Sequence, residues 1–82
     1  MSDRDESVVW VSELQYDRAR YLLSMSENGA CALSAVDREL LEWVVVSHRL
    51  KGKVSAASMR DAARVWRTFV RSRIRSVAPE AA

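Results

Sequence analysis

The chain contains very few residues that interrupt a helix, with 2 glycines and 1 proline among 82 residues. Strands linked by tight turns need more of this punctuation, whereas long helices with short connections need little. The length suits one small domain, and a hydrophobic content of 49% is too high for a chain that is disordered throughout. The sequence therefore predicts an all-α fold, a compact three-helix bundle with helices at about residues 7–28, 34–51 and 55–78.

The first predicted helix ends at Gly29, a residue suited to the left-handed conformation that often follows a helix. Residues 7–11 are rich in β-branched side chains and could be extended instead, but no second strand is evident, so we expect a helix. We further expect residues 1–6 to be a flexible acidic N-terminus, residues 7–78 a single helical domain and residues 79–82 a frayed tail.

The second predicted helix is apolar around much of its circumference. Ser34, with Asp37 three residues later, approximates a capping box at its start, and Gly52 marks its end. Its main apolar stripe consists of Val36, Leu40, Trp43, Val44, Ser47 and Leu50, and the stripe is widened by Leu41, Val45 and Val46. So broad a stripe predicts a helix that lies at the centre of the bundle or packs against a second subunit. The three widening residues are therefore candidates for self-association.

The third predicted helix, with Ser55 or Ser58 as its N-cap, carries the feature that most favours a function. Five arginines recur at spacings of 4, 3, 4 and 4 residues and are called here the arginine stripe: Arg60, Arg64, Arg67, Arg71 and Arg75. At 100° per residue they follow one side of the helix. They lie roughly 100° from its apolar face, which consists of Met59, Ala62, Ala63, Trp66, Phe69, Val70 and Val77. Because neighbouring like charges repel, we expect the stripe to face solvent and bind an anionic partner, with Arg49, Lys51 and Lys53 extending the positive surface.

One tryptophan falls on the predicted inner face of each helix, at Trp10, Trp43 and Trp66. An indole buries a large area, so we expect all three in the core. The inner face of the first helix also includes Val11, Leu14, Tyr21, Leu22 and Met25, and it is interrupted by Arg18.

The net charge of +2 hides a division along the chain. Residues 1–42 hold four basic and nine acidic residues, a net charge of −5, whereas residues 43–82 hold nine basic and two acidic residues, a net charge of +7. Such polarity favours a nucleic acid, an acidic protein or the acidic half of another copy as a partner. The two halves could also neutralise each other within one fold.

Residues suited to catalysis are scarce. His48 is the only histidine and Cys31 the only cysteine, and a Cys–His pair with Asp37 would lack any recognisable flanking signature. The chain also lacks zinc-ligand spacings and a glycine-rich phosphate loop. We therefore expect no enzyme, no catalytic residues, no metal, no cofactor and no small-molecule substrate. A single cysteine, a start unlike a secretory signal and the lack of an apolar run of ~20 residues predict a cytoplasmic protein that does not bind membranes.

Two functions fit this pattern. In the first, the stripe binds nucleic acid in a regulatory or accessory DNA-binding role, and the second and third helices form a pair like a helix–turn–helix. In the second, the chain is a protein–protein interaction module, such as a phage- or plasmid-type inhibitor or adaptor (anti-CRISPR-like), that docks on an acidic surface of a larger complex. A homodimer is compatible with both.

Overall fold

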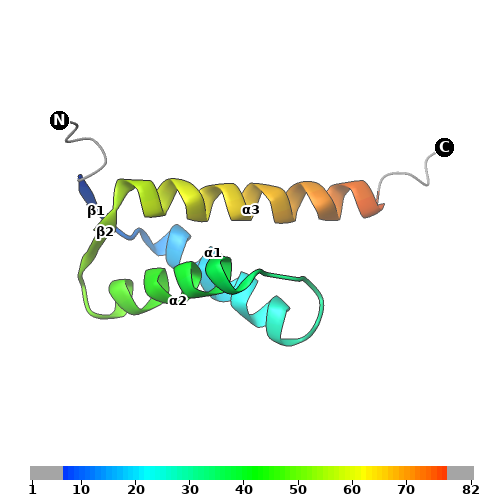
Figure 1. Ribbon diagram of the computed structural model, residues 1–82, viewed down its shortest axis with the longest axis horizontal. Helices are drawn as coiled ribbons and strands as arrows, with labels where there is room; N and C mark the ends of the chain where they lie inside the picture. Colours follow the sequence, from blue (N-terminus) through cyan, green and yellow to red (C-terminus); the bar gives the residue numbers. More distant parts are fainter. Residues whose placement is uncertain (1–6, 78–82) are drawn as a thin grey trace.

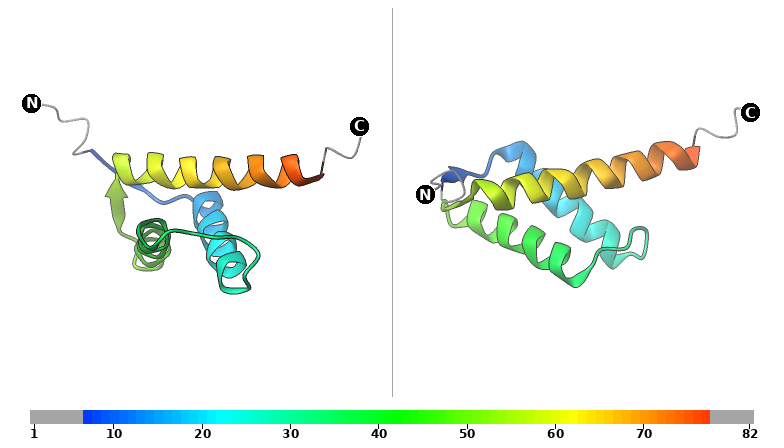
Figure 2. Two further views of the ribbon diagram at one scale, coloured as in Figure 1. Left: turned by 45° about the vertical axis from the view of Figure 1, so that its right-hand side comes forward. Right: turned by 45° about the horizontal axis from the view of Figure 1, so that its top comes forward.

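The computed structural model describes residues 7–77, including the side chains of residues 7–74. The elements in chain order are β1 (Val8–Trp10), α1 (Glu13–Glu27), α2 (Ala35–Arg49), β2 (Lys53–Ser55) and α3 (Ala56–Val77). The helices α1 and α2 pack together, and α3 crosses the pair on one side (Figures 1 and 2). The three predicted helices and the mostly helical character are confirmed. The expectations for residues 1–6 and 79–82 concern parts of the chain outside the described residues.

A small antiparallel sheet is the main departure from the predicted all-α fold. β1 pairs with β2 in the register Val8 with Ser55, Val9 with Val54, and Trp10 with Lys53. The predicted helix over residues 7–12 is therefore wrong. The β-branched segment does find a partner strand, in the connection between α2 and α3.

The late start of α1 has a local cause. The side chain of Ser12 accepts a hydrogen bond from the Gln15 backbone N–H at 3.1 Å, and the Gln15 side chain accepts one from the Ser12 N–H at 2.8 Å. This reciprocal capping box satisfies two of the free N–H groups of the first turn, so the helix begins at Glu13. At the other end Gly29 has φ 79°, which confirms the predicted left-handed terminator.

The bounds of α2 and α3 also follow from their caps. Ser34 accepts a hydrogen bond from the Asp37 N–H at 3.0 Å, as predicted. α2 ends at Arg49, shortly before the predicted stop at Gly52, and Lys51 adopts the left-handed conformation with φ 57°. Of the two candidate caps of α3, Ser55 accepts a hydrogen bond from the N–H of Ser58 at 3.0 Å.

The core lies between the three helices and β2. Its buried apolar side chains are Val11, Ala19, Leu22, Leu41, Val44, Val45, Val54, Met59 and Val65, and Tyr16, Leu23, Trp66 and Phe69 are among those that pack against it. The prediction of three core tryptophans is wrong for Trp10 and Trp43, which are 62% and 54% exposed. β1 removes Trp10 from the helical pattern, and α2 turns Leu41 and Val44 inward, which leaves Trp43 outside.

Two leucines of α1 test this assignment of the core. Leu22 is fully buried, whereas Leu14, also on the predicted inner face, is 57% exposed. We expect Leu22→Ala to lower the free energy of unfolding by about 2–5 kcal/mol, because it leaves a cavity. Leu14→Ala should change it by no more than about 0.5 kcal/mol. Urea unfolding followed by circular dichroism measures both, and equal losses would contradict the observed orientation of α1.

Candidate functional site

The arginine stripe lies on the outer side of α3. Arg60, Arg64, Arg67 and Arg71 are all exposed, and the side chain of Arg75 lies outside the described ones. Two positions along a helix correspond to about 200°, so Arg67 and Arg71 point away from Phe69, which packs on the core. The angle around the helix axis between the stripe and the core side of α3 is thus larger than the expected 100°. The core side is shifted because Val65 is buried and Ala63 is exposed.

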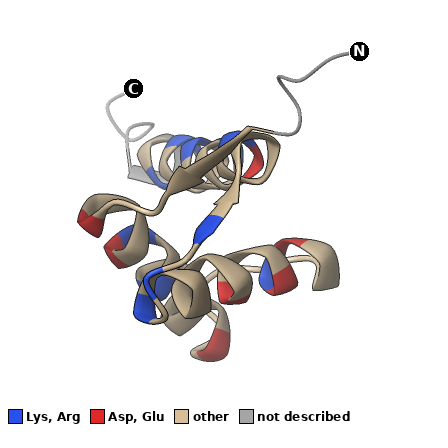
Figure 3. Ribbon diagram, turned by 90° about the vertical axis from the view of Figure 1, so that its left-hand side faces the viewer, with Lys and Arg blue, Asp and Glu red and all other residues tan. Residues whose placement is uncertain are grey.

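The charge of α3 is almost entirely positive. The helix contains six arginines and a single acid, Asp61. The Arg64 Nη2 lies 3.2 Å from the Asp61 Oδ1, and both side chains are more than half exposed, so this ion pair contributes little to stability. Among the described residues, neither Arg67 nor Arg71 has an ion-pair partner. Figure 3 shows basic segments on α3 and around β2, and acidic ones mainly on α1 and α2.

The stripe has an apolar border. A shallow depression along α3 is lined by Trp66, Val70 and Ile74 together with Arg67 and Arg71. Ile74 is 61% exposed. The sequence pattern predicted Val70 on the inner face and did not identify Ile74. Trp66, Val70 and Ile74 follow one another at intervals of four residues, which places them in one row along the helix.

Arg18, which interrupted the predicted inner face of α1, has a defined contact. Its guanidinium carbon lies 4.9 Å from the centroid of the Trp66 ring, a cation–π arrangement. Tyr21 and Phe69 meet the same indole at centroid distances of 6.1 and 5.8 Å. Trp66 of α3 therefore packs against Arg18 and Tyr21 of α1, which favours a structural role for this indole.

The three other basic candidates lie outside α3, and two of them have contacts of their own. The Arg49 Nε donates to the Tyr16 hydroxyl at 3.4 Å, and the Lys53 Nζ lies 4.8 Å from the centroid of the Trp10 ring. Lys51 is exposed at the turn that follows α2. β2 lies between this turn and α3, so the connection is not the short turn of a helix–turn–helix.

The candidates for self-association are divided by the fold. Leu41 and Val45 are buried in the core, so neither can form the exposed surface that we expected. Val46 is exposed.

An aromatic cluster joins α1 to the C-terminal part of α2. The rings of Tyr16 and His48 stack with centroids 4.1 Å apart, and the His48 Nε2 lies 3.5 Å from the Glu13 Oε1. The hydrogen bond from Arg49 stabilises the phenolate and lowers the pKa of Tyr16 below its usual value of 10.0, with smaller contributions from the positive charges of Arg49 and Arg20.

The residues of the Cys–His pair considered from the sequence, Cys31 and His48, lie apart. Cys31 and Asp37 line a cleft that the α1–α2 loop forms with α3. His48 is 11 residues beyond Asp37 on α2, about 16 Å at 1.5 Å per residue, and faces Tyr16.

The described residues include no group of three or more His, Cys, Asp or Glu side chains that could hold a metal ion. Within residues 7–77, no helical segment combines the length and the hydropathy of a membrane span.

Comparisons with protein-family models, with curated proteins and with solved structures find no match to this chain.

The contact between Arg49 and Tyr16 gives a spectroscopic prediction. In a Tyr21→Phe background, Tyr16 is the only tyrosine, because the chain has two. Arg49→Met should raise the pKa of the Tyr16 phenol, since it removes the hydrogen bond and the charge that favour the phenolate. Ultraviolet difference absorbance during alkaline titration measures the shift. Arg38→Met, which removes an α2 arginine that donates to Ser26, is the control and should leave the titration unchanged.

Proposed function

We propose that this protein is a non-enzymatic nucleic-acid-binding protein that contacts the phosphate backbone with the arginine stripe of α3, in a regulatory or accessory role. The observation that carries the proposal is the row of exposed arginines on a helix that contains one acid. The planar guanidinium group can donate two parallel hydrogen bonds to a phosphate, which makes arginine well suited to this ligand.

The dimensions of the stripe are compatible with a phosphate backbone. From Arg60 to Arg71 the helix rises about 16 Å, and successive arginines are about one turn, or 5.4 Å, apart. Phosphates along one DNA strand are separated by about 3.4 Å of helix axis, so the described stripe spans about five of them. Flexible arginine side chains can accommodate the difference in spacing. Contacts of this kind position a protein on the duplex without reading the base sequence.

The electrostatics of the stripe supports an anionic ligand. Arginines three or four residues apart repel each other, which costs an isolated helix about 0.2–0.5 kcal/mol per pair. Asp61 pairs with Arg64, whereas Arg67 and Arg71 have no ion-pair partner among the described residues. A row of phosphates would replace repulsion by attraction along the whole stripe and release the counterions of the nucleic acid. We therefore expect binding that weakens steeply as salt rises.

The test is a fluorescence-anisotropy titration of labelled duplex and single-stranded DNA and RNA at two salt concentrations. Arg67→Gln/Arg71→Gln removes two arginines without an ion-pair partner among the described residues. We expect this variant to bind all sequences more weakly. On duplex DNA, the slope of log affinity against log salt should become shallower by about 0.9 for each phosphate that the variant no longer neutralises.

The matched control is Arg20→Gln/Arg38→Gln, which makes the same change in net charge on exposed positions of α1 and α2. It should retain the affinity within about a factor of 2, because these arginines do not belong to the stripe. Equal losses in both variants would show attraction to the overall charge rather than a binding surface. Absence of binding at low salt would rule out the proposed function.

The apolar border of the stripe favours an acidic protein surface as the second candidate ligand. Ile74 is largely exposed beside Arg71, and arginine next to apolar side chains is typical of protein interfaces. The chain would then be an inhibitor or adaptor that docks on a larger complex. Ile74→Ala separates the two ligands, because it should weaken a protein complex while it leaves a phosphate-dominated contact unchanged.

A further inference from the structure

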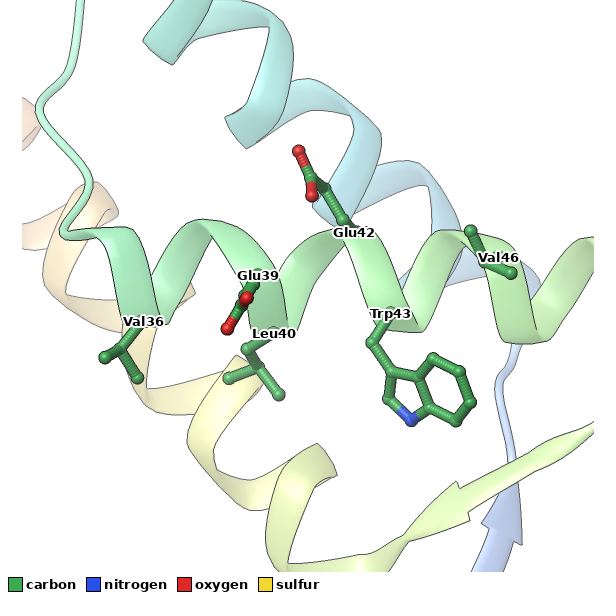
Figure 4. Close-up of a pocket in the computed structure, with 6 residues that line it drawn as sticks. All are labelled: Val36, Glu39, Leu40, Glu42, Trp43 and Val46. Atoms are coloured by element: carbon green, nitrogen blue, oxygen red, sulfur yellow. The ribbon is translucent and has the colours of Figure 1, made fainter.

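A second apolar surface lies on α2, away from the core. It consists of Val36, Leu40, Trp43 and Val46 with Leu50 at the C-cap, and we call it the α2 face. Val36 is 73% exposed and Leu50 75% exposed. Figure 4 shows Val36, Leu40 and Trp43 pointing to the same side of the helix, with Glu39 beside them. Single exposed apolar residues are common, but a continuous row along a whole helix marks an interaction site.

The apolar core lies on the other side of α2. The apolar side chains that α2 buries are Leu41, Val44 and Val45, and none of them belongs to the α2 face. Ser47 is also buried, between Trp43 and Leu50. The helix therefore has two apolar sides, of which the monomer covers one. A helix that is apolar on two sides is expected to be buried from two sides.

The spacing of the α2 face is symmetric about Trp43. Val36 and Leu50 each lie seven residues from Trp43, and Leu40 and Val46 each lie three residues from it. A two-fold axis next to Trp43 would therefore bring Val36 of one antiparallel copy to Leu50 of the other and place the two Trp43 side chains next to each other. Closed two-fold dimers use the same patch on both subunits, which this pattern satisfies.

The charges along α2 favour the same arrangement. Residues 35–42 contain Asp37, Arg38, Glu39 and Glu42, a net charge of −2, and residues 43–51 contain Arg49 and Lys51, a net charge of +2 with neutral His48. Antiparallel copies place the acidic half of one helix beside the basic half of the other, whereas parallel copies would place like charges together. The two helix dipoles also oppose each other in the antiparallel pair.

We propose that a second copy of this chain covers the α2 face, in a two-fold dimer built on antiparallel α2 helices with Trp43 at its centre. No residue of the arginine stripe belongs to the α2 face, so dimer formation and nucleic-acid binding can be tested separately.

Sedimentation equilibrium of the full chain over a range of micromolar concentrations tests the proposal. The mass of the natural chain should rise towards that of a dimer, and Trp43→Ala should weaken the dimer about tenfold or more, as expected for an aromatic residue at the centre of an interface. Trp10→Ala is the control, because Trp10 is at least as exposed but lies on β1. Circular dichroism checks that both variants keep the fold.

A monomeric mass at the highest concentration would overturn the proposal and indicate that a different protein covers the α2 face. An equal effect of Trp10→Ala and Trp43→Ala would also overturn it, because the interface would then not be centred on α2.

Disulfide crosslinking tests the direction of the two helices. In a Cys31→Ser background, we mix Val36→Cys with Leu50→Cys under oxidising conditions and expect a crosslinked dimer, because these positions face each other in the antiparallel pair. Val36→Cys alone should not crosslink, since its two copies are then about 21 Å apart along the helix axis at 1.5 Å per residue. Crosslinking of Val36→Cys alone would show parallel helices and overturn the proposed arrangement.

Discussion

The packing of one side of α2 against the rest of the chain determines most of this structure. Leu41 and Val44 are fully buried, together with Leu22 from α1 and Val54 from β2. These contacts fix the rotation of α2 about its axis. The opposite choice would have buried Val36, Leu40 and Trp43, and the present core side would then face water. Because a domain of this size has a small core, few alternative contacts could compensate for turning the helix.

Local signals in the sequence are sufficient to predict where several helices begin or end. Ser34 caps α2 as predicted, and Gly29 ends α1 in the left-handed conformation. The capping box of Ser12 and Gln15 is equally local, and its sequence could have placed the start of α1 correctly. These interactions span only a few residues, so they can be read without knowledge of the fold.

Three other features could not be predicted from local pattern. The strand pairing of Val9 with Val54 joins distant parts of the chain, and nothing in either short segment identifies the other. The sequence of α2 does not determine which side faces inward, because both sides are apolar. The choice depends on the side chains of α1 and α3 against which α2 packs. The exposed position of the arginine stripe was predictable, since charge alone disfavours its burial, but its apolar border was not.

The pairing of β1 with β2 also has a consequence for the order in which the chain acquires its contacts. Val8 and Ser55 are 47 positions apart, and both α1 and α2 lie between them. A ribosome that has just completed β1 has not yet made the strand with which it pairs. Each of the two intervening helices can form local contacts before that partner exists, and closure of the sheet then encloses them in a single loop. The first element in the sequence is therefore among the last to obtain its neighbour.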